Sequence, residues 1–139
     1  MKKTATLLII ILAIQTVIGQ TEIEKINTTL LNYIEGTANG TPERVRKAFD
    51  ENLNLYHIKN DTLVTWKGKN YVNNIKEGKK KNRIGRIISV DYENDAAMAK
   101  VEILMPKWKR IYTDYMMLLK IKGEWKIVHK SFTYRKYPE

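Results

Sequence analysis

The chain of 139 residues contains no cysteine. Disulfide bonds and a lipid anchor attached through a cysteine are therefore both excluded, and the fold must be stabilised by packing alone. Histidine is nearly as rare, because only His57 and His129 occur. Two histidines without cysteine or paired carboxylates beside them do not make a metal-ligand set. We therefore predict no metal site and no cofactor.

Serine is also scarce, with only Ser89 and Ser131, and neither lies in a turn that would present a nucleophile. The chain has no phosphate-binding loop, dinucleotide fingerprint or zinc-binding His-Glu helix. These absences exclude the common hydrolase, nucleotide-binding and metalloprotease classes. What the composition leaves open is ligand binding or acid–base chemistry.

Residues 1–19 have the pattern of a secretory signal peptide. The pair Lys2–Lys3 precedes an apolar run over Leu7–Ile14, and Gly19 is the small residue before the expected cleavage site. The apolar run is short for a membrane span, although a retained N-terminal anchor is the alternative. We predict export to the periplasm or secretion, no stable membrane span after cleavage, and a single domain over 20–139.

Basic residues outnumber acidic ones by 25 to 15, which gives a formal net charge of +10. Such an excess can attract nucleic acid or other anions. Its densest run, Lys76–Arg86, lies between predicted elements and has no interleaved aromatic residues. We interpret this run as a solvated loop and predict no nucleic-acid partner, since export also separates the protein from nucleic acid.

Three helices are predicted in the first half of the chain. A capping box from Thr21 to Glu24 begins the first helix, which keeps helical spacing to about Thr37. Thr41-Pro42 begins a second helix, which carries Ala48 and Phe49 inward. Two short strands are expected over 53–58 and 63–66, and a third helix over 68–78.

The second half of the chain alternates apolar and polar residues with a period of two, which is typical of antiparallel strands with one buried face. Helices followed by strands predict an α+β fold in which three helices pack on one face of a curved antiparallel sheet. The last hairpin, Tyr112–Phe132, departs from this alternation because both of its faces are apolar. We therefore predict a homodimer formed through the outer face of the sheet.

Asp114 is the one carboxylate inside the first strand of this hairpin. Aspartate is rare in strands, and its charge is costly to bury. Either Asp114 faces a pocket, or it lies on the solvent side, where Lys109, Arg110 or Lys130 could pair with it. Its neighbours of the same parity, Met116 and Leu118, favour the pocket.

The arrangement resembles the nuclear transport factor 2-like superfamily, which folds as a cone of three helices closed by a curved sheet. Within it, the chain is most similar to the exported proteins called putative lumazine-binding or SnoaL-like. The resemblance spans Thr21–Tyr134 and rests on these segments: Tyr33–Thr37 with Asn39-Gly40, Ala48-Phe49, Thr113–Tyr115, Leu118–Ile121 and Gly123–Val128. It implies a conical pocket, but this fold hosts isomerases, dehydratases, cyclases and binding proteins alike.

Ketosteroid isomerase is the member of this superfamily whose site is best understood. The resemblance places its helical tyrosine on Tyr33 and its late-strand aspartate on Asp114, the two donors of an oxyanion hole. The position of the catalytic base falls near His57 rather than on an aspartate. Histidine can move protons near neutral pH.

We hold three hypotheses. The first is an exported binding protein whose apolar conical pocket takes a small, flat, mainly apolar ligand. The second is an enzyme of the isomerase, dehydratase or cyclase type, with Tyr33 and Asp114 as oxyanion-hole donors and His57 as base. The third is an interaction module whose pocket is filled by side chains. The predicted ligand-binding residues are Tyr33, Phe49, His57, Trp66, Asp114 and Met116.

Overall fold

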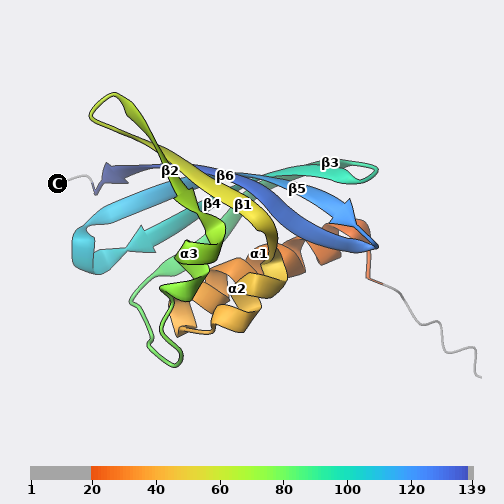
Figure 1. The fold of residues 1–139 in the computed structure, drawn as a ribbon, viewed down its shortest axis with the longest axis horizontal. Helices are drawn as coiled ribbons and strands as arrows, with labels where there is room; N and C mark the ends of the chain where they lie inside the picture. Colours follow the sequence, from red (N-terminus) through yellow and green to blue (C-terminus); the bar gives the residue numbers. More distant parts are fainter. Residues whose placement is uncertain (1–19, 138–139) are drawn as a thin grey trace, which may run out of the picture.

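The computed structural model describes residues 20–137, so the predicted signal peptide over 1–19 lies outside the described residues. Within that range the chain forms three α-helices, one short 3-10 helix and six strands (Figure 1). In chain order they are α1 (Glu22–Asn39), α2 (Pro42–Ala48), β1 (Phe49–Lys59), β2 (Thr62–Lys67), α3 (Gly68–Asn73), β3 (Ile84–Glu93), β4 (Ala96–Met105), η1 (Pro106–Trp108), β5 (Arg110–Ile121) and β6 (Glu124–Lys136).

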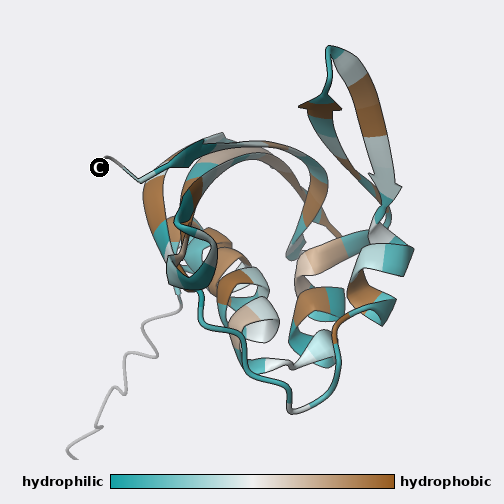
Figure 2. Cartoon of the chain, turned by 90° about the vertical axis from the view of Figure 1, so that its left-hand side faces the viewer, coloured by the Kyte–Doolittle hydropathy of each residue, from teal (hydrophilic) through white to brown (hydrophobic). Residues whose placement is uncertain are grey.

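The six strands form one sheet in the order β2-β1-β6-β5-β4-β3. The sheet bends over the three helices, which cover its concave face (Figure 2), and the tip of the β1–β2 hairpin extends beyond the sheet (Figure 1). This is the predicted α+β cone. The sheet is antiparallel except between β1 and β6, which run parallel. Strand β1 therefore pairs with the last strand of the chain, and the two run in the same direction.

Three boundaries differ from the sequence prediction. Phe49 is extended and begins β1, where it pairs with Ile127, rather than ending helix α2. Strand β1 is consequently longer than the predicted 53–58. Helix α3 ends at Asn73, several residues before Gly78.

Helix α1 begins with a capping box, which confirms the prediction from the sequence. The Thr21 side chain accepts a hydrogen bond from the Glu24 amide, and the Glu24 carboxylate accepts one from the Thr21 amide. The helix ends at Gly40, which has a positive φ of 65° that favours glycine. Both ends of α1 are thus determined locally, and this fixes which of its side chains face the sheet.

The apolar core lies between the helices and the concave face of the sheet. Helix α1 contacts β3 closely at Gly85, where an added Cβ would lie 2.4 Å from Cγ2 of Ile34. The absence of a side chain at Gly85 therefore sets how near α1 approaches the sheet. Among the described residues, no helix is long and apolar enough to span a lipid bilayer.

Glu22 connects the start of α1 to the β5–β6 hairpin. Its carboxylate lies 2.9 Å from Nζ of both Lys25 and Lys120, and it accepts a 2.8 Å hydrogen bond from the indole of Trp125. These three donors lower the pKa of Glu22 to about 2.

We expect an NMR titration of the Glu22 carboxyl carbon to give a midpoint near pH 2 rather than near 4.5. Because the pKa is lowered on folding, the carboxylate stabilises the fold above pH 4.5, and this contribution is lost as the pH falls through about 2. Glu22→Gln should therefore lower the urea midpoint at pH 7 and lose its effect in acid. Glu124→Gln is the control, because Glu124 pairs only with Lys126 on an exposed surface. A Glu22 midpoint near 4.5 would contradict the expectation.

Candidate functional site

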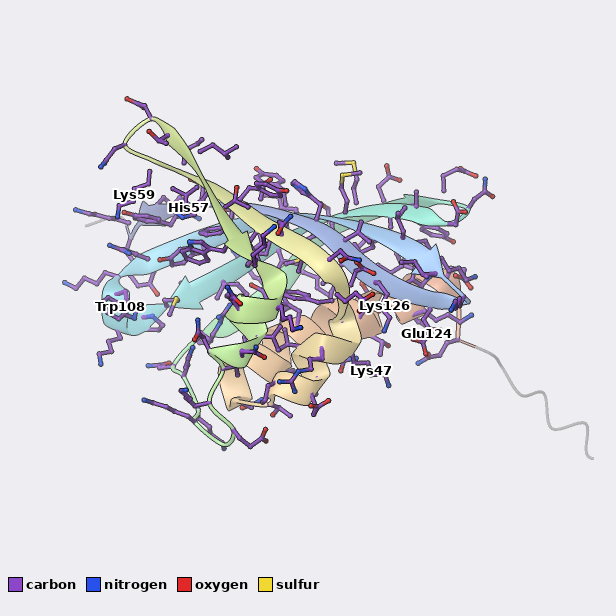
Figure 3. The ribbon with its side chains drawn as sticks, viewed as in Figure 1. Lys47, His57, Lys59, Trp108, Glu124 and Lys126 are labelled. Carbon is purple, nitrogen blue, oxygen red and sulfur yellow. The ribbon has the colours of Figure 1, made fainter. Side chains whose placement is uncertain are left out.

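A cavity of about 740 Å³ opens on the concave side of the sheet, towards the ends of β1, β5 and β6. Figure 3 shows His57 and Lys59 at this end of the sheet, opposite the end that carries Glu124 and Lys126. Two kinds of side chain dominate the wall, aromatic and basic. The aromatic residues are Tyr33, Trp66, Tyr71, Tyr112, Phe132 and Tyr134, and the basic residues, besides His57, are Lys59, Lys81, Arg83, Arg110 and Lys130.

Strand register places the polar residues of the wall on one face. Asp114 on β5 lies opposite Phe132 on β6, and Met116 lies opposite Lys130. Residues directly opposite in antiparallel strands share a face, so all four point into the concave side. Lys130 and Asp114 are therefore diagonal neighbours, within reach of each other. Tyr33 meets them from helix α1 on the other side.

Tyr33, Asp114 and Lys130 form a closed polar cluster. The Tyr33 hydroxyl donates a 2.7 Å hydrogen bond to Oδ2 of Asp114, and Nζ of Lys130 lies 2.9 Å from the same oxygen. Lys130 also donates to the Tyr33 hydroxyl. The three residues are 0%, 1% and 4% exposed, so they are almost sealed from water. This buried ion pair with its phenol forms the floor of the cavity.

The charges around the floor shift the pKa values of its two tyrosines in opposite directions. Burial, reinforced by the Asp114 carboxylate, raises the pKa of Tyr33 well above its usual value, so Tyr33 remains a donor. Burial also acts to raise the pKa of Tyr71, but Lys130 and Arg83 outweigh it, and the pKa of Tyr71 is lowered. Of these two phenols, Tyr71 is thus the more readily deprotonated.

Above the floor, aromatic rings form the outer wall. The Phe132 ring lies 4.8 Å from that of His57 and 5.3 Å from that of Trp66, measured between ring centres. Arg110 lies 4.3 Å over the ring of Tyr134 and donates to the Tyr112 hydroxyl. These contacts fix flat surfaces around the entrance, which suits a planar ligand.

Two polar atoms in the wall are buried without a partner among residues 20–137. They are Nε2 of His57 and Nε of Arg83. Nδ1 of His57 has only a long contact, 3.4 Å, to the Ile58 carbonyl. Native structures rarely leave such groups unsatisfied, and binding sites are one place where they do.

The structure brings together most of the residues predicted from sequence. Tyr33, His57, Trp66 and Asp114 all border this one cavity. Phe49 does not, because it stacks behind Tyr33, 5.5 Å between ring centres, and faces a separate surface depression. Met116 also lies outside the lining, and it is buried in the core at 1% exposure.

Sequence reasoning did not identify Tyr71, Arg83, Lys130 and Phe132 as wall residues. Tyr71 is part of an apolar helix face, and Arg83 belongs to the basic run that was interpreted as a solvated loop. For Lys130, the obstacle is a bulge in β6. Met117 pairs with His129 and Leu118 with Ile127, so one extra residue shifts the parity of the strand. No signal in the sequence reveals that bulge.

The described residues contain no group of three or more histidine, cysteine or acidic side chains that could hold a metal ion. Lys130 occupies the position next to Asp114 where a cation would otherwise be attracted. The side chains that line this site offer hydrogen bonds, charge and aromatic stacking to a ligand.

Comparison with known proteins is consistent with this architecture. The chain is similar to a nuclear transport factor 2-like protein of unknown function from Silicibacter pomeroyi, at 19% identity and a TM-score of 0.70, with 84% of this chain and 100% of that one covered. A protein of the same description from Methylobacillus flagellatus shows 26% identity and a TM-score of 0.68, covering 81% and 91%. No protein with a curated description matches the chain.

A family model described as putative lumazine-binding matches residues 21–133, which is most of the described chain. The match includes every element from α1 to β5 and nearly all of β6. The cone-shaped fold is therefore that of the nuclear transport factor 2-like superfamily, and the chain belongs to the putative lumazine-binding family.

Proposed function

We propose that this protein is an exported binding protein that holds a small, flat ligand in the cavity on the concave side of its sheet. The observation that carries the proposal is the cavity itself, about 740 Å³ in volume with aromatic rings at its entrance. Pockets of roughly 300–1,000 Å³ are the usual size for small molecules. The family description, putative lumazine-binding, points to the same class of role.

Export is supported by the amino-acid sequence of residues 1–19. Its basic start, short apolar run and small residue before the expected cleavage site favour secretion or delivery to the periplasm. The absence of cysteine removes any dependence on the redox state of that compartment.

The polar floor favours binding over the isomerase-type alternative. An oxyanion hole needs donors that point at the substrate. Here the Tyr33 hydroxyl donates to Asp114 instead, and the ion pair with Lys130 leaves Asp114 as an acceptor. Both side chains are also almost inaccessible to water. The open volume in turn argues against the filled-pocket alternative.

We further propose that the outer face of the sheet pairs with a second copy of the chain. Met98, Tyr115, Met117 and Leu119 project from it and are 40–61% exposed. Met98 and Met117 are direct partners across β4 and β5. Contiguous apolar side chains of this size on one face are typical of an interface.

Native mass spectrometry of protein purified from its own host tests the binding function. We expect a retained small-molecule mass on wild-type protein and on Trp108→Ala, and its loss from Trp66→Ala. Trp66 lines the cavity, whereas Trp108 is an exposed residue that does not. Trp66 is itself 44% exposed, so its removal should leave the fold intact. Equal retention by both variants, or no retained mass on wild type, would contradict the proposal.

A further inference from the structure

The charges around the cavity are unbalanced. Five basic side chains border it, besides His57, and among residues 20–137 Asp114 is the only acidic one that does. Asp114 already pairs with Lys130. The other four are Lys59, Lys81, Arg83 and Arg110, and no carboxylate among residues 20–137 lies within ion-pairing distance of them. A concave wall with one sign of charge attracts ligands of the other sign.

Arg83 is the most deeply buried of these four cations. Nη2 lies 3.4 Å from the Tyr33 hydroxyl, and Tyr71 interacts with the same guanidinium. Its Nε is buried without a partner in the described part of the chain. Arg83 borders the cavity, and a guanidinium fits the two oxygens of a carboxylate or phosphate well.

The cationic and aromatic parts of the wall are close enough for one small molecule to touch both. Nζ of Lys130 lies 4.6 Å from the centre of the Tyr33 ring and 5.3 Å from that of Phe132. The Arg83 guanidinium lies 5.9 Å from the same Tyr33 ring. Phe132 in turn contacts His57 and Trp66. The anion-binding groups and the flat surfaces thus surround a single space.

We propose that the ligand of this cavity is a planar aromatic anion, whose ring lies among His57, Trp66 and Phe132 and whose carboxylate or phosphate binds Arg83, with Lys81 and Arg110 at the rim. This inference rests on the proposed binding function and replaces the mainly apolar ligand expected from sequence. Tyr33 and Asp114 hold Lys130 in the floor beneath the ligand rather than contacting it.

A matched pair of probes tests the inference, namely 2-naphthoate and its neutral isostere 2-naphthamide. We expect isothermal titration calorimetry with the purified protein to show naphthoate binding at least about tenfold more tightly than naphthamide, as a charge-assisted hydrogen bond predicts. Raising the salt concentration from about 0.05 M to about 0.5 M should lower the affinity for naphthoate and leave the affinity for naphthamide nearly unchanged.

Substitutions identify the side chains that cause the preference for naphthoate. Arg83→Gln should remove the preference for naphthoate over naphthamide without lowering the affinity for naphthamide. Arg86→Gln is the matched control, because Arg86 lies outside the cavity and pairs with Glu102, and it should change neither affinity. Lys81→Gln is a second test in case Arg83→Gln misfolds. The Lys81 side chain is exposed, so its replacement should leave the fold intact and should lower the affinity for naphthoate several-fold.

The outcomes separate this inference from the proposed function. If both probes bind with equal affinity and Trp66→Ala lowers both affinities, the cavity is a binding site, but the inference of an anionic ligand is wrong. If naphthamide binds more tightly, the inference is overturned in the same way. If neither probe binds up to its solubility limit, both the aromatic anion and the aromatic binding site are overturned.

Discussion

Asp114→Asn is expected to destabilise the protein by about 3–5 kcal/mol, because it leaves the Lys130 ammonium buried without its counterion. Lys130 is 4% exposed, and in the variant only the Tyr33 hydroxyl remains from its two anchoring contacts. Typical domains are stable by about 5–15 kcal/mol, so the loss is a large fraction of the total. Urea unfolding followed by circular dichroism measures it directly.

The double variant Asp114→Asn with Lys130→Met separates the buried charge from loss of packing. Removing both charges should recover much of the stability, since an apolar replacement of a buried pair is often close to neutral. An exposed pair provides the control: Arg86→Met breaks the contact with Glu102 and should cost about 0–1 kcal/mol. A cost below about 1 kcal/mol for Asp114→Asn, equal to that control, would show that water reaches the pair.

This expectation changes how a mutation at Asp114 is interpreted. Sequence resemblance alone suggests that asparagine would preserve the fold and remove only a proton donor. The ion pair with Lys130 predicts a folding defect instead. Loss of function in Asp114→Asn is therefore no proof of catalysis unless the variant is shown to be folded.

Local signals predicted the framework of the fold. The capping box at Thr21 fixed the start of α1, and the β period of two gave the strands that cover the helices. The parity of Asp114 with Met116 and Leu118 indicated that the carboxylate points inward, and all three are buried. Each of these signals depends on residues close together in the chain, which is why they were visible.

The composition of the cavity depends on contacts between distant segments. Lys130 enters the floor through a bulge in β6, and its partner Tyr33 lies 97 residues earlier. Arg83 enters from a loop whose sequence is indistinguishable from a solvated basic run. The parallel pairing of β1 with β6 has no local signature either. The sequence indicated Lys130 as a possible partner of Asp114 on the solvent side, but no local signal placed that pair in the buried floor beside Tyr33.

Met117→Asp is expected to convert a homodimer of this protein into a folded monomer. Met117 lies on β5, one of the two middle strands of the sheet, 48% exposed on the outer face, with Met98 and His129 as its direct cross-strand partners. A two-fold interface presents the same patch from both copies, so one substitution introduces two charges into the apolar contact. Sedimentation equilibrium should show the mass falling by half, while circular dichroism remains unchanged.

Leu63→Asp is the matched control, because Leu63 is 61% exposed but lies on the β1–β2 hairpin. It should leave the mass at that of the dimer. A wild-type protein that is monomeric at micromolar concentration would contradict the proposed pairing. A dimer broken by Leu63→Asp but not by Met117→Asp would move the interface to the hairpin. Because the cavity opens on the concave side and the four apolar residues project from the opposite one, loss of the dimer through Met117→Asp should leave ligand affinity unchanged.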